Sequence, residues 1–336
     1  MRKQNIVTWA MASLLFASVS CKKEYVEPEF KTKSFGMYAS FYNHGSGGAN
    51  LNPTLLSTYA VEGAKDLSNG CLTHEWSFWK AGAPDASGNV EYTRAEDGVS
   101  FIKDNSNMGW GTIEDFTPFI DPTIKPTNSE QQITFLFEKG GAYKLRIRNT
   151  YDVPIRYMYS VNDSVDNSTP VTQYINSVPL GNGEHEVVRE YKMEVFEKLV
   201  PTVRIFRDAA QTKEIVMTDS IEIEGFKAAE ITINAGESLY FRDATGEDEN
   251  GVSTFYSAPS SRSWVWECLQ TPDGHVGPIP TVKPFSSEDA KPVFTFDEKG
   301  CYRVTMTIKR EKPEGYSDKF PEVSLTQKLP IIVYAL

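Results

Sequence analysis

Two stretches of the sequence, FLFEKGGAYKLRI at residues 135–147 and FTFDEKGCYRVTM at residues 294–306, follow one pattern. Each begins with Phe-x-Phe, passes through a charged turn, and has a glycine two places before a tyrosine. Apolar residues then alternate with polar ones, which is the two-residue period of a half-buried strand. Each stretch therefore predicts a hairpin of two strands, and the chain uses this hairpin twice.

The repeat extends to both sides of the hairpin. In each copy an aspartate turn precedes a strand that contains tryptophan, and a mainly apolar strand ends the copy. The matching segments are the turns at 64–70 and 241–246, the strands with Trp76 and Trp264, and the closing strands at 193–196 and 331–334. Two copies of one strand order predict two tandem domains, at residues 34–198 and 199–336.

The composition favours an all-β fold. Of the 336 residues 12% are aromatic, with 19 Phe and 16 Tyr, and there are 23 Gly and 19 Pro. This mixture is typical of pleated sheets broken by many turns. A sandwich buries alternate residues of two facing sheets, and a tyrosine at the corner position bonds back to the backbone. The expected core consists of Trp76, Phe78, Phe135, Phe137, Tyr143, Leu145 and Ile147 in the first domain, and of Trp264, Trp266, Phe294, Phe296, Tyr302, Val304 and Met306 in the second.

The order of aspartate turn, tryptophan strand, Phe-x-Phe and Gly-x-Tyr resembles the PKD family (the polycystic-kidney-disease domain), in particular the PKD-like domains of Bacteroidetes lipoproteins. The resemblance covers most of both halves and implies two tandem immunoglobulin-like β-sandwiches. The first domain departs from the pattern by a long insertion at 79–130, and the second by a shorter one at 246–261. Many such lipoproteins accompany polysaccharide-uptake systems, so the resemblance also implies a place beside an outer-membrane uptake complex.

The first residues have the features of an export signal. The stretch MRKQNIVTWAMASLLFASVSC at 1–21 combines a basic start with an uncharged, mostly apolar run. Its end resembles a bacterial lipoprotein signal, although Ser18 stands where leucine is usual. We therefore expect a signal peptide at 1–20, a lipid on Cys21 that anchors the protein in the outer membrane at the cell surface, and a flexible tether at 21–33. The alternative is an ordinary secreted protein in which Cys21 is incidental.

Charge and motif content argue against several classes of function. A net charge of −11 gives no drive toward polyphosphate, so nucleic acid is not an expected partner. The four histidines are dispersed, the patch HGSGG at 44–48 matches neither a phosphate loop nor a nucleophile elbow, and the acidic clusters match no calcium loop. We expect a non-catalytic protein with no cofactor or metal, whose remaining cysteines, Cys71, Cys268 and Cys301, are free thiols.

The long insertion holds the candidate ligand site. Trp110 lies between two glycines, so its sequence neighbours cannot pack it firmly, and its flat face could stack on a sugar ring. Carboxylates and amides beside an aromatic surface suit a polyhydroxylated ligand. The expected contact residues are Trp110, Asp115, Asn107, Phe116, Trp79 and Tyr92. The alternative is that Trp110 closes the end of the sandwich as a buried lid.

These features favour a cell-surface lipoprotein that binds polysaccharide or oligosaccharide. A structural or adhesive stalk of tandem sandwiches is the alternative, and an enzyme that acts on glycosides comes third. Two short segments, Asp163-Ser164-Val165 and Asp219-Ser220-Ile221, resemble the acceptor for O-glycosylation in Bacteroidetes. They predict glycosylation at Ser164 and Ser220.

Overall fold

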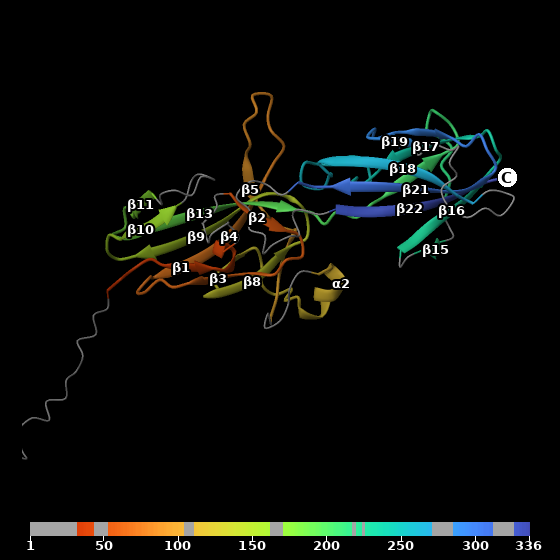
Figure 1. Cartoon of the computed structure of the whole chain (residues 1–336). Coiled ribbons are helices and arrows are strands. Elements are labelled where there is room, and N and C mark those ends of the chain that lie inside the picture. The colour runs from red at the N-terminus through yellow and green to blue at the C-terminus, as the bar shows by residue number, and fades with distance from the viewer. Residues whose placement is uncertain are drawn as a thin grey trace, which may run out of the picture.

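The computed structural model describes residues 32–43, 53–103, 111–161, 171–216, 220–223, 226–270, 285–311 and 326–336. Their regular structure is almost entirely β-strand, and it forms two sandwiches that follow one another along the chain (Figure 1). The predicted fold class, tandem immunoglobulin-like β-sandwiches, is confirmed. Cys21 and Ser164 lie outside the described residues, and Ser220 is the first residue of a strand, β15.

The first sandwich packs a small sheet against a large one. In the described residues, the small sheet has the order β1-β3-β8-β6, and the large one the order β12-β13-β9-β4-β5, with β2 beside β13 and β7 beside β4. The strands of the small sheet are β1 (Met37–Ala39), β3 (Glu62–Asp66), β8 (Gln132–Phe137) and β6 (Val99–Phe101). Those of the large sheet are β12 (Val178–Pro179), β13 (His185–Phe196), β9 (Gly141–Tyr151), β4 (Thr73–Ala81), β5 (Tyr92–Arg94), β2 (Thr54–Ser57) and β7 (Thr127–Asn128). A hairpin and three helical turns complete it: β10 (Arg156–Val161), β11 (Val171–Asn176), η1 (Ser40–Asn43), α2 (Ile113–Phe116) and η3 (Thr117–Phe119).

The second sandwich repeats this plan with fewer strands. Its described sheets have the orders β14-β17-β20 and β15-β16-β22-β21-β18-β19. The strands are β14 (Val203–Phe206), β17 (Ser238–Asp243), β20 (Val293–Thr295), β15 (Ser220–Ile223), β16 (Phe226–Ile233), β22 (Thr326–Ala335), β21 (Gly300–Lys309), β18 (Ser261–Gln270) and β19 (Phe285–Ser287). In both domains the closing strand pairs in parallel with an early strand, β13 with β2 and β22 with β16. The repeat seen in the sequence is therefore a repeat of topology.

Each domain has its own core, made of the residues that the alternation predicted. Trp76 and Trp264 are fully buried, and each indole donates to a backbone carbonyl, that of Glu130 at 2.7 Å and that of Asp289 at 2.9 Å. Trp266 is the exception to full burial, since it is half-buried and packs edge-on against Phe294. Apart from Trp266, every predicted core residue is buried.

Both tyrosine corners form as predicted. The Tyr143 hydroxyl donates to the carbonyl of Lys139 at 3.0 Å, and the Tyr302 hydroxyl donates to that of Glu298 at 2.8 Å. Burial is the main reason that the pKa of Tyr143 is raised and that of Tyr302 rises to about 12. Each phenol therefore stays neutral and fixes the charged turn to the strand that follows it.

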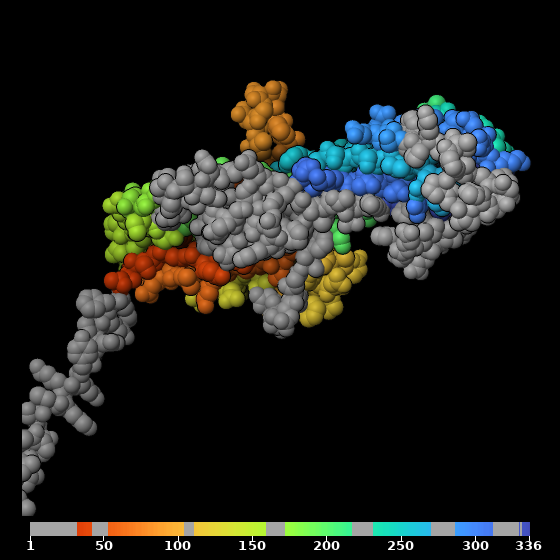
Figure 2. Space-filling view, viewed as in Figure 1, coloured from red at the N-terminus to blue at the C-terminus, as the bar shows by residue number. Residues whose placement is uncertain are grey.

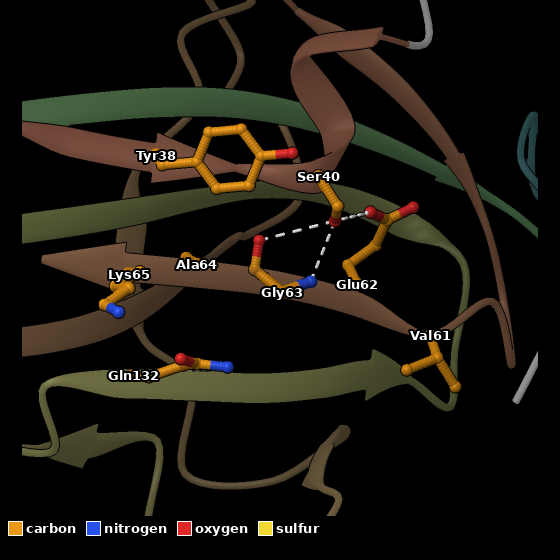
Figure 3. Close-up of a pocket in the computed structure, with 8 residues that line it drawn as sticks. All are labelled: Tyr38, Ser40, Val61, Glu62, Gly63, Ala64, Lys65 and Gln132. Atoms are coloured by element: carbon orange, nitrogen blue, oxygen red, sulfur yellow. Dashed lines mark hydrogen bonds between the residues drawn. The ribbon is translucent and has the colours of Figure 1, made fainter. Parts of the chain in front are cut away.

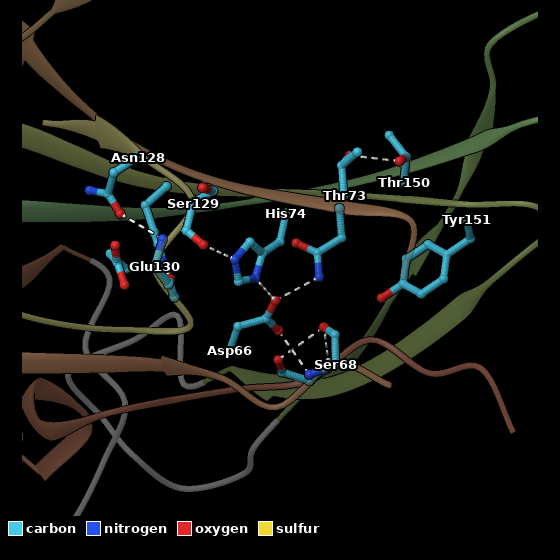
Figure 4. Close-up of polar contacts among 12 residues, drawn as sticks. Asp66, Ser68, Thr73, His74, Asn128, Ser129, Glu130, Thr150 and Tyr151 are labelled. Atoms are coloured by element: carbon cyan, nitrogen blue, oxygen red, sulfur yellow. Dashed lines mark hydrogen bonds and ion pairs between the residues drawn. The ribbon is translucent and has the colours of Figure 1, made fainter. Parts of the chain in front are cut away.

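The aspartate of each turn has a buried carboxylate that binds a basic side chain of the tryptophan strand. In the first domain, Nδ1 of His74 lies 2.9 Å from a carboxylate oxygen of Asp66 (Figure 4), and Asn149 donates to the same oxygen at 3.0 Å. In the second, the carboxylate of Asp243 accepts from Nε of Arg262 at 2.7 Å. One buried carboxylate thus ties the turn to the sheet in each domain, with a different basic partner.

The insertion at 79–130 is built into both sheets of the first domain. Residues 79–81 complete β4, while β5 and β7 extend the large sheet and β6 extends the small one. The turn between β4 and β5 projects from the body of the molecule near the junction of the two sandwiches (Figures 1 and 2). The insertion therefore widens the sandwich and does not form a separate lobe.

The two sandwiches contact each other through the second insertion and a buried arginine. Phe196, the last residue of β13, packs edge-on against Tyr256, and the Glu197 amide donates to the Tyr256 carbonyl at 2.8 Å. Arg310 is buried and donates to the carbonyls of Glu197 and Tyr256. Its guanidinium also lies over the Phe196 ring, 5.4 Å from the centroid. These contacts connect the end of the first domain with the second.

Candidate functional site

Two of the predicted contact residues, Trp79 and Tyr92, lie on the outer face of the large sheet. Trp76 and Phe78 of β4 point inward, so Trp79 points outward in the alternation of the strand. Trp79 lies opposite Lys144 of the neighbouring strand β9, and Tyr92 of β5 lies opposite Ala81 of β4. Both rings are half-buried. We refer to Trp79, Tyr92 and the charged side chains around them as the aromatic platform.

Cations hold the indole of Trp79 in place. The guanidinium carbon of Arg146 lies 4.3 Å from the ring centroid and that of Arg94 lies 5.6 Å from it. The indole nitrogen donates to Ser77 Oγ at 3.1 Å. Cation–π contact and this hydrogen bond orient the ring before any ligand arrives, which lowers the entropy cost of binding.

Each cation of the platform pairs with a carboxylate, and Lys144 and Arg146 share one. Lys144, whose Nζ is 4.1 Å from the Tyr92 centroid, also lies 3.4 Å from Glu190, and Arg146 pairs with the same carboxylate. Arg94 pairs with Glu75 at 3.2 Å. The platform therefore combines flat aromatic surface with alternating donors and acceptors and little net charge.

The carboxyl groups of this face respond differently to their surroundings. Burial raises the pKa of Glu190, but the hydrogen bond from Arg146 and the charge of Lys144 outweigh burial and hold the pKa below its usual value. Glu194 lies four residues further along β13, and burial raises its pKa. Burial and then the charges of Glu194 and Glu190 raise the pKa of Tyr92, so its hydroxyl stays a hydrogen-bond donor.

Of the other predicted contact residues, the structure describes Phe116 and Asp115, and both have local structural roles. Phe116 is buried and packs with Ile102 and Leu136, so its ring does not face solvent. Asp115 is exposed, but its carboxylate accepts from the amide of Thr112 at 2.8 Å and closes a capping box at the start of α2. Trp110 and Asn107 lie outside the described residues.

One hollow was not expected from the sequence. Tyr38, 54% exposed, stands on the outer face of the small sheet beside a cavity of about 300 Å³ (Figure 3). Gly63 forms part of its floor, and its amide donates to Ser40 Oγ at 2.8 Å. Lys65 lines the same cavity. No strand was predicted over Gly63, which lies inside β3; a glycine within a strand marks a place where something approaches the backbone closely.

Within the described ranges, no group of three or more His, Cys, Asp or Glu side chains could hold a metal ion. The acidic loop of the second domain uses its own carboxylates, because Asp248 accepts from the amide of Val252 at 2.9 Å and Glu247 pairs with Arg242. Cys71, Cys268 and Cys301 form no disulfide within the part of the chain that the structure describes. No described helix is long and apolar enough to cross a membrane.

The chain is similar to several solved structures of immunoglobulin-domain proteins. The amphioxus IgVJ-C2 molecule has 11% identity and a TM-score of 0.26, over 84% of this chain and 99% of that one. The N-terminal four Ig domains of Dscam1 isoform 6.44 have 10% identity and a TM-score of 0.28, over 90% of this chain and 46% of that one. No family model and no curated protein matches the sequence.

Proposed function

We propose that this chain is a non-catalytic cell-surface lipoprotein that binds a neutral or weakly charged polysaccharide. The observation that supports the proposal best is the aromatic platform. Trp79 and Tyr92 offer apolar ring surface to the C–H face of a sugar, and the ion-paired side chains beside them offer donors and acceptors to its hydroxyls. Because the cations are already paired, a neutral ligand fits this surface better than a strongly anionic one.

The remaining parts of the proposal come from the sequence. A lipid on Cys21 would hold the protein in the outer membrane, and the PKD-like repeat order would place it among Bacteroidetes lipoproteins of polysaccharide-uptake systems. Trp110 and Asn107 stay in the proposed site on sequence grounds. Single shallow sites bind weakly, with Kd between about 1 mM and 1 μM, and many anchored copies would add avidity.

Affinity gel electrophoresis with a panel of neutral polysaccharides tests the proposal. The double variant Trp79→Ala/Tyr92→Ala should lose the retardation that the unchanged protein shows in at least one gel. Tyr174→Ala is the matched control, since Tyr174 also lies under an arginine, Arg156 at 4.0 Å, and is 50% exposed, but belongs to β11 and not to the platform. Loss of retardation in Tyr38→Ala, with the double variant unchanged, would move the site to the small sheet.

A stalk or adhesive module is the second candidate, favoured by the contacts that join the two sandwiches end to end. A protein that serves only as a spacer should show no retardation in any of the gels. That outcome would leave the fold as described and remove the glycan-binding proposal.

A further inference from the structure

A cleft of about 730 Å³ lies between the two sandwiches, and both insertions contribute to it. Residues 111–114 of the first insertion form one wall, and Gly246, Asp248 and Val252 of the second insertion form part of the opposite wall. Its volume is in the range of small-molecule sites, which occur preferentially at domain interfaces. The two segments that depart from the repeated plan therefore meet at one place.

The walls of the cleft are fixed to each other. One carboxylate oxygen of Glu197, which lines the cleft, accepts from the amide of Gly140 at 2.9 Å. The backbone of the same residue pairs with Tyr256 and with Arg310 of the second domain. A cleft held open in this way needs little ordering when a ligand enters.

The backbone at Tyr59, on the floor of the cleft, is strained. Its φ of 57° lies in the left-handed region, which a bulky side chain rarely adopts. Hydrogen bonds hold it there, from its own amide to the Phe137 carbonyl at 2.9 Å and from the Gly111 amide to its carbonyl at 3.3 Å. Strain of this kind persists where the surrounding structure enforces it, and it is concentrated at functional sites.

The lining combines exposed apolar groups with charges of both signs. Val200 and Val252 are each 58% exposed although they line a concave surface. The charged side chains of the lining are three lysines and five carboxylates: Lys80, Lys139, Lys198, Glu114, Glu138, Glu197, Glu247 and Asp248. A sugar hydroxyl can donate to a carboxylate and accept from an ammonium at once, whereas an excess of carboxylates repels an anion.

We infer that this cleft is a second carbohydrate site, which takes a short neutral oligosaccharide such as the end of a polysaccharide chain. Val200 and Val252 contact its apolar ring faces, and the lysines and carboxylates bind its hydroxyls. The inference rests on the proposed function for the class of ligand, but it concerns a site separate from the aromatic platform. The second insertion, which contributes no residue to the platform, would then take part in binding through the cleft.

Isothermal titration of the full chain with neutral trisaccharides, and with an acidic trisaccharide for comparison, tests the inference. Val252→Arg places a long cationic side chain in the cleft and should weaken neutral trisaccharide binding at least ~10-fold. Val178→Arg is the matched control, because Val178 is 60% exposed on β12 and does not line the cleft. Glu114→Gln, with the exposed Glu288→Gln as its control, should also weaken binding while the melting temperature stays unchanged.

The outcomes separate the two sites. Trisaccharide binding that falls in Val252→Arg and persists in Trp79→Ala supports the cleft. Binding that falls only in Trp79→Ala overturns the cleft and leaves the platform intact. Tighter binding of the acidic trisaccharide, or no binding of any neutral trisaccharide while polysaccharide gels still retard the protein, also overturns the inference.

Discussion

The outer faces of the two large sheets carry different chemistry at equivalent positions. Trp79 lies three residues after the buried Trp76, and Glu267 lies three residues after the buried Trp264, so the two positions are equivalent. Each lies opposite a cation on the neighbouring strand, Lys144 for Trp79 and Arg303 for Glu267. Glu267 forms an ion pair with Arg303, whereas Trp79 lies beside Lys144 and under Arg146. The same frame thus presents an aromatic surface in one domain and a closed ion pair in the other.

This difference arises from the strands that flank the tryptophan strand in each domain. The insertion of the first domain supplies β5, which brings Tyr92 and Arg94 beside Trp79. In the described part of the second domain, β19 pairs with β18 at Trp264–Trp266, which are the positions that β7 takes in the first domain, and no described strand takes the place of β5. The proposed platform therefore belongs to the first domain, and the second domain contributes a wall of the cleft.

The largest effects are expected from the two buried tryptophans. Trp76→Ala and Trp264→Ala each remove a fully buried indole and leave a cavity, which costs about 3–5 kcal/mol. If the cores are independent, calorimetry should show each substitution lowering only the transition of its own domain. Trp79→Ala, at the surface, is the control and should leave both transitions in place. A single transition that falls equally in both variants would argue for one continuous core.

The sequence predicted the cores because alternation and aromatic spacing depend on contacts within single hairpins. Phe135, Phe137 and Tyr143, for example, lie where the alternation placed them. It did not predict the burial of Phe116, since a short helix between loops has no period that marks its inner side. It also missed Arg310 and the cleft, because these depend on contacts between Glu197 and residues more than fifty positions away.

The next test compares two fragments that begin on either side of the domain boundary, 199–336 and 195–336. The shorter fragment lacks Phe196 and Glu197, so the buried guanidinium of Arg310 loses a ring and a carbonyl. The longer fragment should be more stable by about 1–3 kcal/mol in urea denaturation. Arg310→Met should reduce the difference between the two fragments to what the contacts of Phe196 and Glu197 with Tyr256 contribute. Equal stability of the unchanged fragments would show that Arg310 needs no partner from the first domain.

Exchanging the equivalent surface residues tests the platform more gently. Trp79→Glu should give the first domain the ion pair of the second, with Lys144 as partner, and weaken polysaccharide retardation by about tenfold, or about 1.4 kcal/mol. The melting temperature of Trp79→Glu should fall by only a few degrees, since the Trp79 ring is half-buried on the outer face and belongs to neither core. The reverse change, Glu267→Trp, should create no binding, because no described residue of the second domain corresponds to Tyr92. Retardation that is unchanged in Trp79→Glu would exclude the platform.

The smallest expected change is in stability and concerns Glu190 and Glu194. The equivalent positions of the second domain are occupied by Pro330 and Tyr334. The raised pKa of Glu194 means that its contribution to stability is present below the unfolded value of about 4.3 and is lost as the pH rises through the folded pKa. Glu194→Gln should therefore melt higher than the unchanged protein at pH 7 and no higher at pH 4.

Glu190 has a lowered pKa, so its contribution is present above about 4.3 and is lost as the pH falls through the folded pKa. Glu190→Gln should consequently melt lower at pH 7, and the difference should vanish at strongly acidic pH. Both changes should stay within about 1 kcal/mol, because the side chains are partly exposed. Melting curves at pH 7 and at acidic pH that shift both variants in the same direction would contradict the opposite roles assigned to these two carboxylates of one strand.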